Sequence, residues 1–408
     1  MQNSFITQIA EEYGTPFYLL DLDKFTNNYK ELENSFKRVY DDFRIAYSFK
    51  ANYTPAICKQ VCFLGGYAEV VSGMEYQMAK KFGFHADRII VNGPGKICGL
   101  YEMLIDGALL MLDNKEELDL VLSLTKKLDK RANIGFRMNF EIGSGKNSRF
   151  GFDAQADGIF SNIEKARNSD RVIIKGLHYH LGGARTLEAW KNRAEKMIVL
   201  SNKLLYPEER CIIDLGSGMF GHLDPELAEQ FSVRIPSFIE YANDVAGSFN
   251  EYFGQAKNRP QLVVEPGATL VADTTSYITK VVAIKKIRGR NIAIVDGSVH
   301  QLGEMGRKKK LPLTIISQNQ SKQSEKKVIN TEITGYTCLE DDVLHPQCCE
   351  PLSVGDLVII GNAGAYSNVL KPPFIQPGCK IVMCDSIKGV TLCKREETVE
   401  DILASYIV

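Results

Sequence analysis

Lys50 closes a short strand-like run and could act as a nucleophile. Phe43, Ile45 and Tyr47 recur every second residue before it, which is the period of a half-buried strand. A lysine at the carboxyl end of a strand in a (β/α) barrel lies on the rim where such barrels carry their active sites. Partial desolvation there should lower the pKa of its ammonium, so that the neutral amine can attack an aldehyde. Since a lone lysine is most often a solvated surface residue, this interpretation depends on the rest of the chain.

Two histidines, His178 and His180, follow another apolar run and precede Gly182 and Gly183. Residues two apart on a strand share a face, so both imidazoles could enter a barrel mouth. A metal pair is one interpretation, but the sequence offers no obvious third ligand nearby. We favour a histidine stacked on an aromatic cofactor, because the following glycines let the backbone approach a ligand. We predict no metal site.

A glycine-rich turn, Gly216-Ser217-Gly218, follows the strand-like run Cys211–Leu215. Such a turn presents backbone N–H groups to an anion. The pattern alone is weak evidence, because many tight turns between a strand and a helix contain two glycines. Its place after the seventh strand-like run favours phosphate, which barrels often bind at that point.

Glu265, in Glu265-Pro266-Gly267, ends the last strand-like run of the alternating region. A carboxylate there could accept a hydrogen bond from a protonated pyridine nitrogen and hold that nitrogen positive. The alternative is a capping glutamate before a Pro-Gly turn. Together with an amine at Lys50, this carboxylate has the chemistry needed to hold pyridoxal phosphate.

The elements that must position these residues alternate between strand-like and helical patterns over about 250 residues, the size of a (β/α)8 barrel. Helical periodicity is clearest at Asp23–Val39, Gly73–Phe82, Lys115–Leu128 and Leu187–Leu205. The strand-like runs are Arg44–Tyr47, Tyr67–Val71, Arg88–Val91, Leu109–Leu112, Ile134–Met138, Ile173–His178, Cys211–Leu215 and Gln261–Val264. A doubly wound open sheet is the alternative. We prefer the barrel because candidate functional residues end nearly every strand.

Strand-like runs dominate after about Val271 and predict an antiparallel β domain. These runs are Ser276–Ile287, Asn291–Asp296, Pro312–Ile316, Lys327–Thr334, Asp356–Gly361, Lys380–Ser386 and Thr391–Arg395. Arg307–Lys310 and Ser317–Lys326 are polar and predict exposed loops. Glu397–Ser405 could form a closing helix.

The totals exclude several classes of protein. A chain of 408 residues with 44% hydrophobic content predicts two globular domains. The net charge of −1 predicts neither nucleic-acid nor membrane partners, and no apolar run approaches a membrane span. The N-terminus lacks the pattern of a secretory signal, and the ten cysteines show no paired metal-knuckle spacing. We expect a reducing, cytoplasmic setting with free thiols.

Short motifs along the chain, taken in order, resemble those of the fold-type III pyridoxal phosphate-dependent decarboxylases. This is the family of the diaminopimelate, ornithine and arginine decarboxylases, and the resemblance runs from Thr15 to about Glu400. The matches are Tyr47–Asn52 to Y-x-x-K-A-N, Glu69–Ser72 to D-V-V-S, Arg137–Asn139 to R-x-N, His180–Gly183 to H-x-G-S, Gly216–Gly218 to G-G-G, Glu265–Ala268 to E-P-G-R, Cys338–Asp342 to C-x-x-x-D and Gly364–Tyr366 to G-A-Y.

The resemblance implies roles for the barrel residues. Lys50 would bind the cofactor as a Schiff base, His180 would stack on its ring, and Glu265 would pair with the pyridine nitrogen. The backbone of Gly216, Ser217 and Gly218 would hold the phosphate, with Gly267 also at the cofactor. Racemases of this barrel class place an arginine near the nitrogen, so a glutamate favours decarboxylation.

The resemblance also implies roles for the rest of the chain. Tyr366 would contribute to phosphate and substrate binding, together with Asp342 and Glu340 at the substrate. Cys338 would enter the site from the partner subunit of a homodimer and protonate the carbanion after CO2 leaves. The implied fold is a barrel of residues 24–272, with residues 1–23 and 273–408 forming a C-terminal antiparallel β-barrel domain.

Three departures bear on the cofactor and the substrate. Gly183 and Ala268 stand where the family has serine and arginine, so the phosphate must depend on the glycine turn, Tyr366 or an unrecognised cation. Leu339 stands where diamine-forming members carry an acid, and an apolar side chain cannot pair an ammonium. Glu340 is one residue further and would point the other way along a strand.

We therefore expect decarboxylation of an amino acid at Cα, with a modified or non-amine distal group. Asn92–Lys96 contains G-P-G-K, which is similar to decarboxylases of natural-product and siderophore pathways. Alternatives are diaminopimelate decarboxylase itself, an amino-acid racemase, or a non-catalytic homologue that acts as a binding protein.

Overall fold

The structure, a computed structural model, describes residues 2–94, 96–205, 211–318, 330–370 and 373–407. The chain divides into two compact units. The barrel unit comprises Thr26–Gly221 and Val233–Thr269, and the β unit comprises Met1–Phe25, His222–Ser232 and Leu270–Val408. Each unit is described by itself below.

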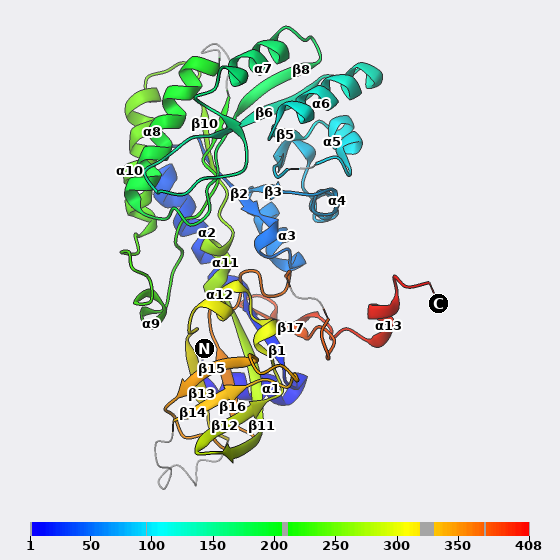
Figure 1. Cartoon of the computed structure of the whole chain (residues 1–408), viewed down its shortest axis with the longest axis vertical. Coiled ribbons are helices and arrows are strands. Elements are labelled where there is room, and N and C mark those ends of the chain that lie inside the picture. Colours follow the sequence, from blue (N-terminus) through cyan, green and yellow to red (C-terminus); the bar gives the residue numbers. More distant parts are fainter. Residues whose placement is uncertain (1, 95, 206–210, 319–329, 371–372, 408) are drawn as a thin grey trace. The chain divides into compact units, whose positions relative to one another are not determined.

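Eight parallel strands form a closed barrel within the described part of the barrel unit (Figure 1). In chain order they are β2 (Phe43–Ser48), β3 (Tyr67–Val70), β4 (Ile89–Val91), β5 (Leu109–Leu112), β6 (Ala132–Asn139), β8 (Val172–His178), β9 (Ile212–Asp214) and β10 (Gln261–Val264). Neighbours in sequence pair with one another, and β10 pairs back onto β2. The predicted (β/α)8 barrel is therefore confirmed, and the open sheet is excluded.

Helices follow the strands and surround the barrel (Figure 1). They are α2 (Leu22–Lys37), α3 (Pro55–Phe63), α4 (Gly73–Lys81), α5 (Leu100–Asp106), α6 (Lys115–Leu128), α7 (Asp157–Arg167), α8 (Leu187–Leu204) and α10 (Phe238–Phe253). Local sequence explains where they begin. Asn114 caps α6 by accepting the N–H of Glu117, and Ser237 forms a capping box with Glu240 at α10.

Glycines allow a close strand contact in the barrel wall. Gly176 of β8 lies against Ile212 of β9, and a Cβ on Gly176 would lie 2.0 Å from the carbonyl oxygen of Ile212. Gly135 of β6 faces Gly176 at a shift in strand register. No larger residue fits between these strands without moving the backbone.

The β unit contains a mixed sheet. Its strands are β1 (Phe17–Asp21), β11 (Thr275–Ile287), β12 (Arg290–Val295), β13 (Leu313–Ile316), β14 (Thr331–Thr334), β15 (Val343–Cys348), β16 (Leu357–Ile360), β17 (Lys380–Asp385) and β18 (Gly389–Lys394). Helix α1 (Asn3–Tyr13) packs Ile6 and Ile9 against a core that includes Phe17 and Val382. Short helices α9 (Pro225–Ala228), α12 (Glu304–Lys308) and α13 (Val399–Leu403) complete the unit.

The predicted β domain differs in one respect, because two of its strand pairs are parallel. β1 pairs in parallel with β17, and β12 pairs in parallel with β14. Parallel neighbours need long connections, which the whole barrel provides for the first pair. The remaining pairs are antiparallel, including β1 with β11.

The basic segment Arg307–Lys310 was predicted as an exposed loop, and this is partly wrong. Its first two residues end α12, and Lys309 is half-buried. The Lys309 ammonium donates to the carbonyl of Gln230 and lies 4.9 Å from the ring centre of Phe231. The ammonium is therefore held by a backbone carbonyl and the face of an aromatic ring. Most of the second predicted loop, Ser317–Lys326, lies outside the described residues.

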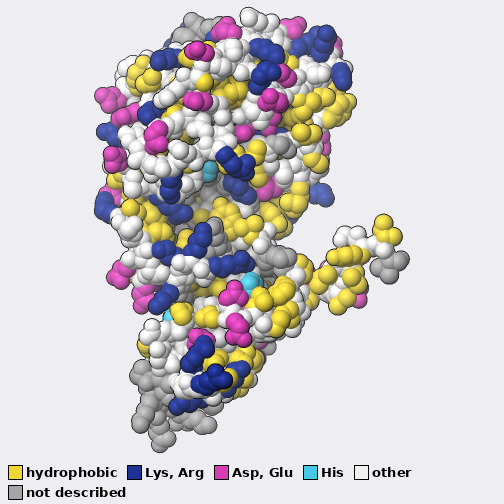
Figure 2. Space-filling model, in the orientation of Figure 1, with side chains coloured by type: hydrophobic (Ala, Val, Ile, Leu, Met, Phe, Trp, Pro, Cys, Tyr) yellow, Lys and Arg dark blue, Asp and Glu magenta, His cyan; other side chains and the backbone are white. Residues whose placement is uncertain are grey.

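On the face drawn in Figure 2, acidic and basic side chains are interspersed over the barrel unit. All ten cysteines lie in the described parts of the chain and are free thiols. Among the described helices, none has the length and apolar content needed to cross a bilayer.

Replacing Gly176 with Ala should destabilise the barrel by about 1–3 kcal/mol, because the new Cβ would overlap a backbone carbonyl of β9. Gly158 of α7 is the matched control, since a Cβ there meets no atom within 4 Å. Gly158→Ala should leave the free energy of unfolding unchanged or raise it. Chemical denaturation of both variants tests this, and equal stabilities would contradict the close strand contact.

Candidate active site

Polar side chains stand at the carboxyl end of every barrel strand. They are Lys50 after β2, Glu69 in β3, Asn92 after β4, Asp113 after β5, Arg137 in β6, His178 in β8, Asp214 in β9 and Glu265 after β10. Because parallel strands of a closed barrel end at one rim, these groups form one ring. The structure thus brings together the predicted residues Lys50, His180, Glu265 and Gly216–Gly218.

Lys50 lies in a single 3-10 turn, η1 (Phe49–Ala51), directly after β2. Its Nζ donates to Ser48 Oγ over 2.8 Å and forms an ion pair with the buried Glu69. The Lys50 side chain remains 33% exposed, so the amine is held by its two partners and is still accessible. Ser48 also donates to Glu69, which fixes the position of that carboxylate.

Gly267 packs against this lysine turn. A Cβ on Gly267 would lie 2.7 Å from the Cβ of Ala51 and 3.1 Å from that of Ser48. The glycine therefore lets the end of β10 approach the end of β2. We predicted Gly267 at the cofactor, and its visible contribution is this close packing.

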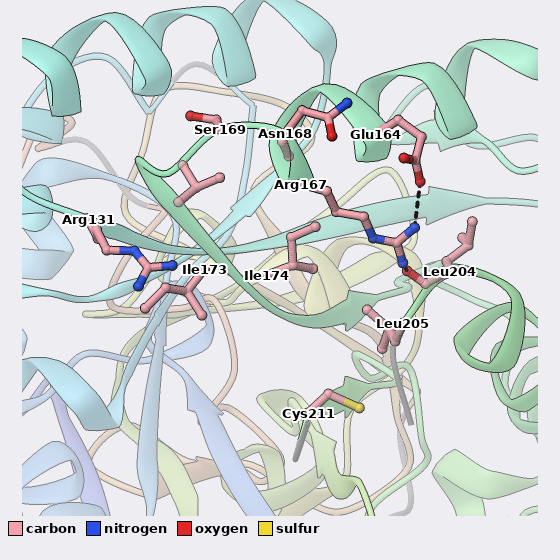
Figure 3. Close-up of a pocket in the computed structure, with 12 residues that line it drawn as sticks. Arg131, Glu164, Arg167, Asn168, Ser169, Ile173, Ile174, Leu204, Leu205 and Cys211 are labelled. Carbon is pink, nitrogen blue, oxygen red and sulfur yellow. Dashed lines mark hydrogen bonds and ion pairs between the residues drawn. The ribbon is translucent and has the colours of Figure 1, made fainter. Parts of the chain in front are cut away.

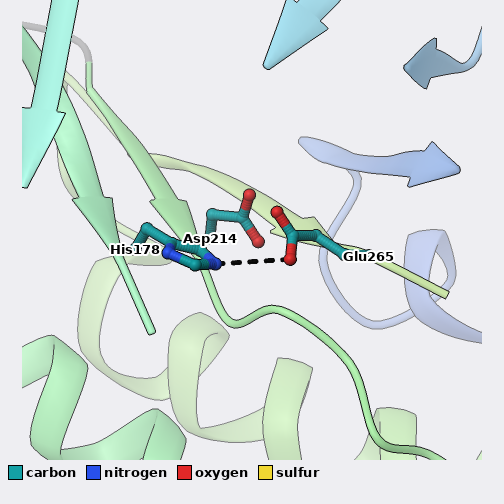
Figure 4. Close-up of side chains that lie close together, drawn as sticks. All are labelled: His178, Asp214 and Glu265. Atoms are coloured by element: carbon teal, nitrogen blue, oxygen red, sulfur yellow. Dashed lines mark hydrogen bonds and ion pairs between the residues drawn. The ribbon is translucent and has the colours of Figure 1, made fainter. Parts of the chain in front are cut away.

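Glu265, His178 and Asp214 converge from β10, β8 and β9 (Figure 4). His178 Nε2 lies 3.3 Å from Glu265 Oε2, and Asn92 donates its side-chain N–H to Glu265 Oε1. One oxygen or nitrogen from each of the three residues in the figure lies within 4.8 Å of the others. Such a trio could bind a metal, but both Glu265 oxygens already have a partner within the protein. His180 lies outside the trio.

Burial controls the ionisation of this trio. It raises the pKa of Asp214 well above the ordinary range, and the adjacent Glu265 charge adds to the effect. Burial also raises the pKa of Glu265 and lowers that of His178 well below its ordinary value. Two buried carboxyl groups this close do not both ionise, so Asp214 keeps its proton and Glu265, which has two partners, carries the charge.

Several buried polar atoms at the rim have no hydrogen-bond partner among the described residues. They are Asn92 Oδ1, Arg137 Nε, His178 Nδ1 and Asp214 Oδ2. Buried polar groups are nearly always paired, so unpaired ones need an explanation. Their concentration at one rim indicates a site arranged around a polar ligand.

His180 follows β8 and contacts the glycine turn. Its Nδ1 accepts the backbone N–H of Ser217 at 3.1 Å, and burial lowers the pKa of the ring well below its ordinary value. Gly216 has φ of +61°, and a Cβ there would lie 2.7 Å from the His180 Cβ. The turn therefore requires glycine and holds a neutral imidazole beside it. The Gly216 N–H is also used internally, by Asp214 Oδ1 at 2.8 Å.

Lys96, from the G-P-G-K stretch, is buried in the wall of the barrel unit. Its Nζ lies 2.7 Å from Glu117 Oε2, and burial lowers its pKa. Gly95 of the same stretch lies outside the described residues. The lysine thus holds α6 to the segment after β4, which is a structural contribution.

Cys338 lies in an exposed loop of the β unit. Asp342 organises this loop: its buried carboxylate accepts the N–H of Val299 at 2.8 Å, the hydroxyl of Ser298 at 3.0 Å and the hydroxyl of Thr337 at 2.7 Å. Asp342 was predicted to bind substrate, and here its oxygens bind the loop and the segment of Ser298 and Val299. Cys338–Asp341 is not a strand, so the strand alternation that turned Glu340 away from Leu339 was a wrong argument. Glu340 is exposed.

Tyr366 is half-buried in the β unit and has φ of +62°, in the left-handed region. Such a conformation is strained for an aromatic residue and persists only where its surroundings impose it. Gly364, two residues earlier, lies close to the preceding segment, since a Cβ there would lie 1.8 Å from the Val271 carbonyl oxygen. The predicted roles of Tyr366 and Cys338 at the cofactor remain predictions.

A separate pocket lies at the opposite, amino-terminal ends of β6, β8 and β9 (Figure 3). Arg167 spans part of it and donates to Glu164 at 2.6 Å and to the Leu204 carbonyl at 2.6 Å. None of the predicted site residues lines this pocket. The amino-terminal face of such barrels contributes stability, and catalysis occurs at the other face.

Sequence reasoning assigned no role to Glu69, Asn92 or Asp214, although the structure places each beside a predicted residue. Glu69 stood in a matched motif, and Asp214 lies two residues before the glycine turn, so both offered a signal. Arg193 on α8 gave no such signal in the sequence. Its guanidinium is fully buried, and only folding brings it to the glycine turn.

Comparison with known families identifies the class of protein. The family model for the pyridoxal binding domain of pyridoxal-dependent decarboxylases matches residues 22–272. The match covers the barrel strands and the whole ring of rim residues. The chain therefore belongs to the pyridoxal-dependent decarboxylases, with pyridoxal phosphate as cofactor and an amino acid as substrate. The racemase and non-catalytic alternatives are not favoured.

Within this family the chain is similar to diaminopimelate decarboxylases. It is 27% identical to diaminopimelate decarboxylase of Methanocaldococcus jannaschii, over 98% of this chain and 93% of the relative. A crystal structure of that enzyme superposes with a TM-score of 0.85 at 25% identity, over 98% of this chain and 94% of the other. The chain is also 25% identical to L-glutamyl-[BtrI acyl-carrier protein] decarboxylase of Niallia circulans, over 98% of this chain and 96% of the relative.

The residues present fit pyridoxal phosphate. Lys50 offers an accessible amine, His180 a neutral ring and Glu265 a buried carboxylate. The unpaired atoms of Asn92 and His178 beside Glu265 provide further polar groups. Lys50 would hold the aldehyde carbon and Glu265 the ring nitrogen.

Asp214→Asn should stabilise the cofactor-free protein increasingly as pH rises. A carboxyl whose pKa is raised on folding is protonated in the folded state and ionised when unfolded, so stability falls above the ordinary aspartate range. Asparagine keeps an oxygen for the Gly216 N–H and does not titrate. Unfolding temperatures of the variant and the wild type from pH 5 to 8, after removal of pyridoxal phosphate, test this. A difference in unfolding temperature that does not grow with pH would contradict it.

Proposed function

We propose that the protein decarboxylates an amino acid at Cα with Lys50 as the residue that binds pyridoxal phosphate covalently. The observation that carries this proposal is the common rim of Lys50, His180 and Glu265, with the lysine accessible and the glutamate buried. When bound, the cofactor supplies an electron sink that accepts the negative charge left on Cα as CO2 departs.

The protein's own residues prepare this chemistry. Glu69 and Ser48 hold the Lys50 amine at the end of β2. Glu265 would hold a positive charge on the ring nitrogen of the bound cofactor, because a buried carboxylate stabilises an adjacent N–H cation. Asp214 remains protonated, so Glu265 is the one negatively charged member of the cluster of His178, Asp214 and Glu265.

We further propose that the enzyme acts as a homodimer in which Cys338 from one subunit reaches the barrel rim of the other. Cys338 is exposed in the described chain, and the Asp342 carboxylate holds its loop in a fixed shape. An exposed thiol on an ordered loop can deliver a proton to Cα without rearranging the barrel. Asp342 would then act on substrate only indirectly, by positioning the loop.

The substrate is proposed to lack a free ammonium at its distal end. Leu339, beside Cys338, is 40% exposed and offers no charge to pair with such a group. Similarity to a decarboxylase named for a glutamyl group on an acyl-carrier protein supports an amino acid carried on a larger group. Diaminopimelate, named for several relatives, is the other candidate.

Lys50→Ala should abolish CO2 release and the visible absorption of the bound cofactor, because the covalent attachment point is lost. Lys126→Ala removes an exposed lysine from α6 and is the matched control, with activity and absorption unchanged. Borohydride treatment of the wild type followed by peptide mass analysis should place the cofactor on Lys50. Retained turnover in Lys50→Ala would refute its assigned role.

Free meso-diaminopimelate should be decarboxylated more slowly than about 1 per second, and an amino acid conjugated at its distal end should be faster. Leu339→Asp should raise turnover of the free diamino acid by about tenfold, because it adds a partner for the distal ammonium. Val354→Asp, at another exposed apolar residue of the β unit, is the control. Ordinary turnover of free diaminopimelate by the wild type would rule out the conjugated substrate.

A further inference from the structure

The glycine turn leaves few of its own amides for a phosphate. The Gly216 N–H donates to Asp214 Oδ1 at 2.8 Å, and the Ser217 N–H donates to His180 Nδ1 at 3.1 Å. Of the three turn residues, Gly218 therefore keeps the N–H that donates to no other group in the described chain. A phosphate dianion needs several donors and normally a cation, so other groups must take part.

Arg193 fixes the orientation of the remaining amides. Its buried guanidinium donates to the carbonyls of Leu215 at 2.9 Å, Ser217 at 3.0 Å and Leu181 at 3.4 Å. In a trans peptide the C=O of one residue and the N–H of the next point in opposite directions. The N–H groups that follow Ser217 and Leu181 therefore point away from Arg193.

The two segments that Arg193 holds lie against each other. A Cβ on Gly218 would lie 3.2 Å from the Leu181 carbonyl and 3.8 Å from the Gly183 nitrogen. The amides of Gly182, Gly183 and Gly218 thus gather in one place, and none of them donates elsewhere in the described residues. Burial lowers the Arg193 pKa to about 10, so the guanidinium stays charged at neutral pH behind these amides.

Lys146 lies directly at this cluster of amides. Its Nζ donates to the Gly183 carbonyl at 3.2 Å and would be 2.5 Å from a Cβ on Gly183. Gly183 has φ of +80°, so a larger residue there would be strained as well as displace the ammonium. The absence of a side chain at this position is what makes room for Lys146.

The loop that carries Lys146 has a defined shape. Asn139 donates to the carbonyls of Ser148 at 2.9 Å and Phe150 at 2.7 Å. Asn192 of α8 donates to the Ile142 carbonyl at 3.2 Å. Lys146 is therefore presented from a segment anchored at both ends of its turn, even though its side chain is exposed.

We propose that Lys146 supplies the cationic contact to the phosphate of the cofactor, in place of a side chain at positions 183 and 268. The ammonium has three N–H donors, of which one is used by Gly183 and the others remain for phosphate oxygens. This inference rests on the proposed function and adds a cofactor-binding residue to it.

The test compares pyridoxal phosphate with pyridoxal, which lacks the phosphate, by equilibrium binding to cofactor-free protein. Lys146→Met should weaken binding of pyridoxal phosphate by about 10- to 100-fold, the loss of one charge-assisted contact, and leave pyridoxal binding unchanged. Lys146→Arg should retain most of the affinity. Inorganic phosphate should compete with pyridoxal phosphate more weakly in Lys146→Met than in the wild type.

Lys196→Met is the matched control. Lys196 is also exposed and donates to the Glu141 carbonyl of the same loop, so its removal changes the charge equally without touching Gly183. It should bind both compounds as the wild type does. Wild-type affinity of Lys146→Met for pyridoxal phosphate, or an equal loss for both compounds, would refute the Lys146 assignment alone. A wild type that binds neither compound would refute the proposed function as well.

Discussion

Closure of the barrel is the constraint on which the site depends. Lys50 and Glu265 are far apart in sequence, and the pairing of β2 with β10 makes them neighbours on one rim. That pairing continues past the strands, since the Ser48 N–H donates to the Pro266 carbonyl at 3.3 Å. Gly267 then fits against Ala51, where any side chain would separate the two strand ends. The Lys50 amine and the Glu265 carboxylate are thus placed by backbone contacts rather than by contact with each other.

Two of the charged groups on the rim differ in burial. Lys50 and Glu69 form an ion pair at the ends of β2 and β3, while His178, Asp214 and Glu265 form a cluster from β8 to β10. Burial acts differently on the two groups, because the lysine remains partly exposed and the cluster does not. A carboxyl that stays protonated beside a carboxylate that stays charged lets the buried cluster direct one negative charge at a ligand.

The sequence pattern correctly predicted features that depend on neighbouring residues alone. The predicted helix Lys115–Leu128 coincides with α6 because a capping asparagine begins it and its apolar face repeats regularly. The position of Lys50 after β2 likewise followed from alternation over a few residues. The parallel pairing of β12 with β14, and the pairing of Lys50 with Glu69, could not be predicted in this way, because each joins segments with no local signal for the other.

The irregular segments near the rim and in the β unit are shaped by single charged side chains. Their shapes could therefore not be predicted from the sequence. Arg193 collects three carbonyls, Asp342 collects donors from two segments of the β unit, and the Glu141 carboxylate accepts the N–H groups of Ile142, Gly143 and Ser144. A charged side chain that satisfies several backbone groups replaces the hydrogen bonds that a helix or strand would provide. Loops built in this way have no periodic pattern, yet their shape is fixed. These charged side chains bind the backbone, and in the proposed site the amides and Lys146 that this backbone presents would bind the ligand.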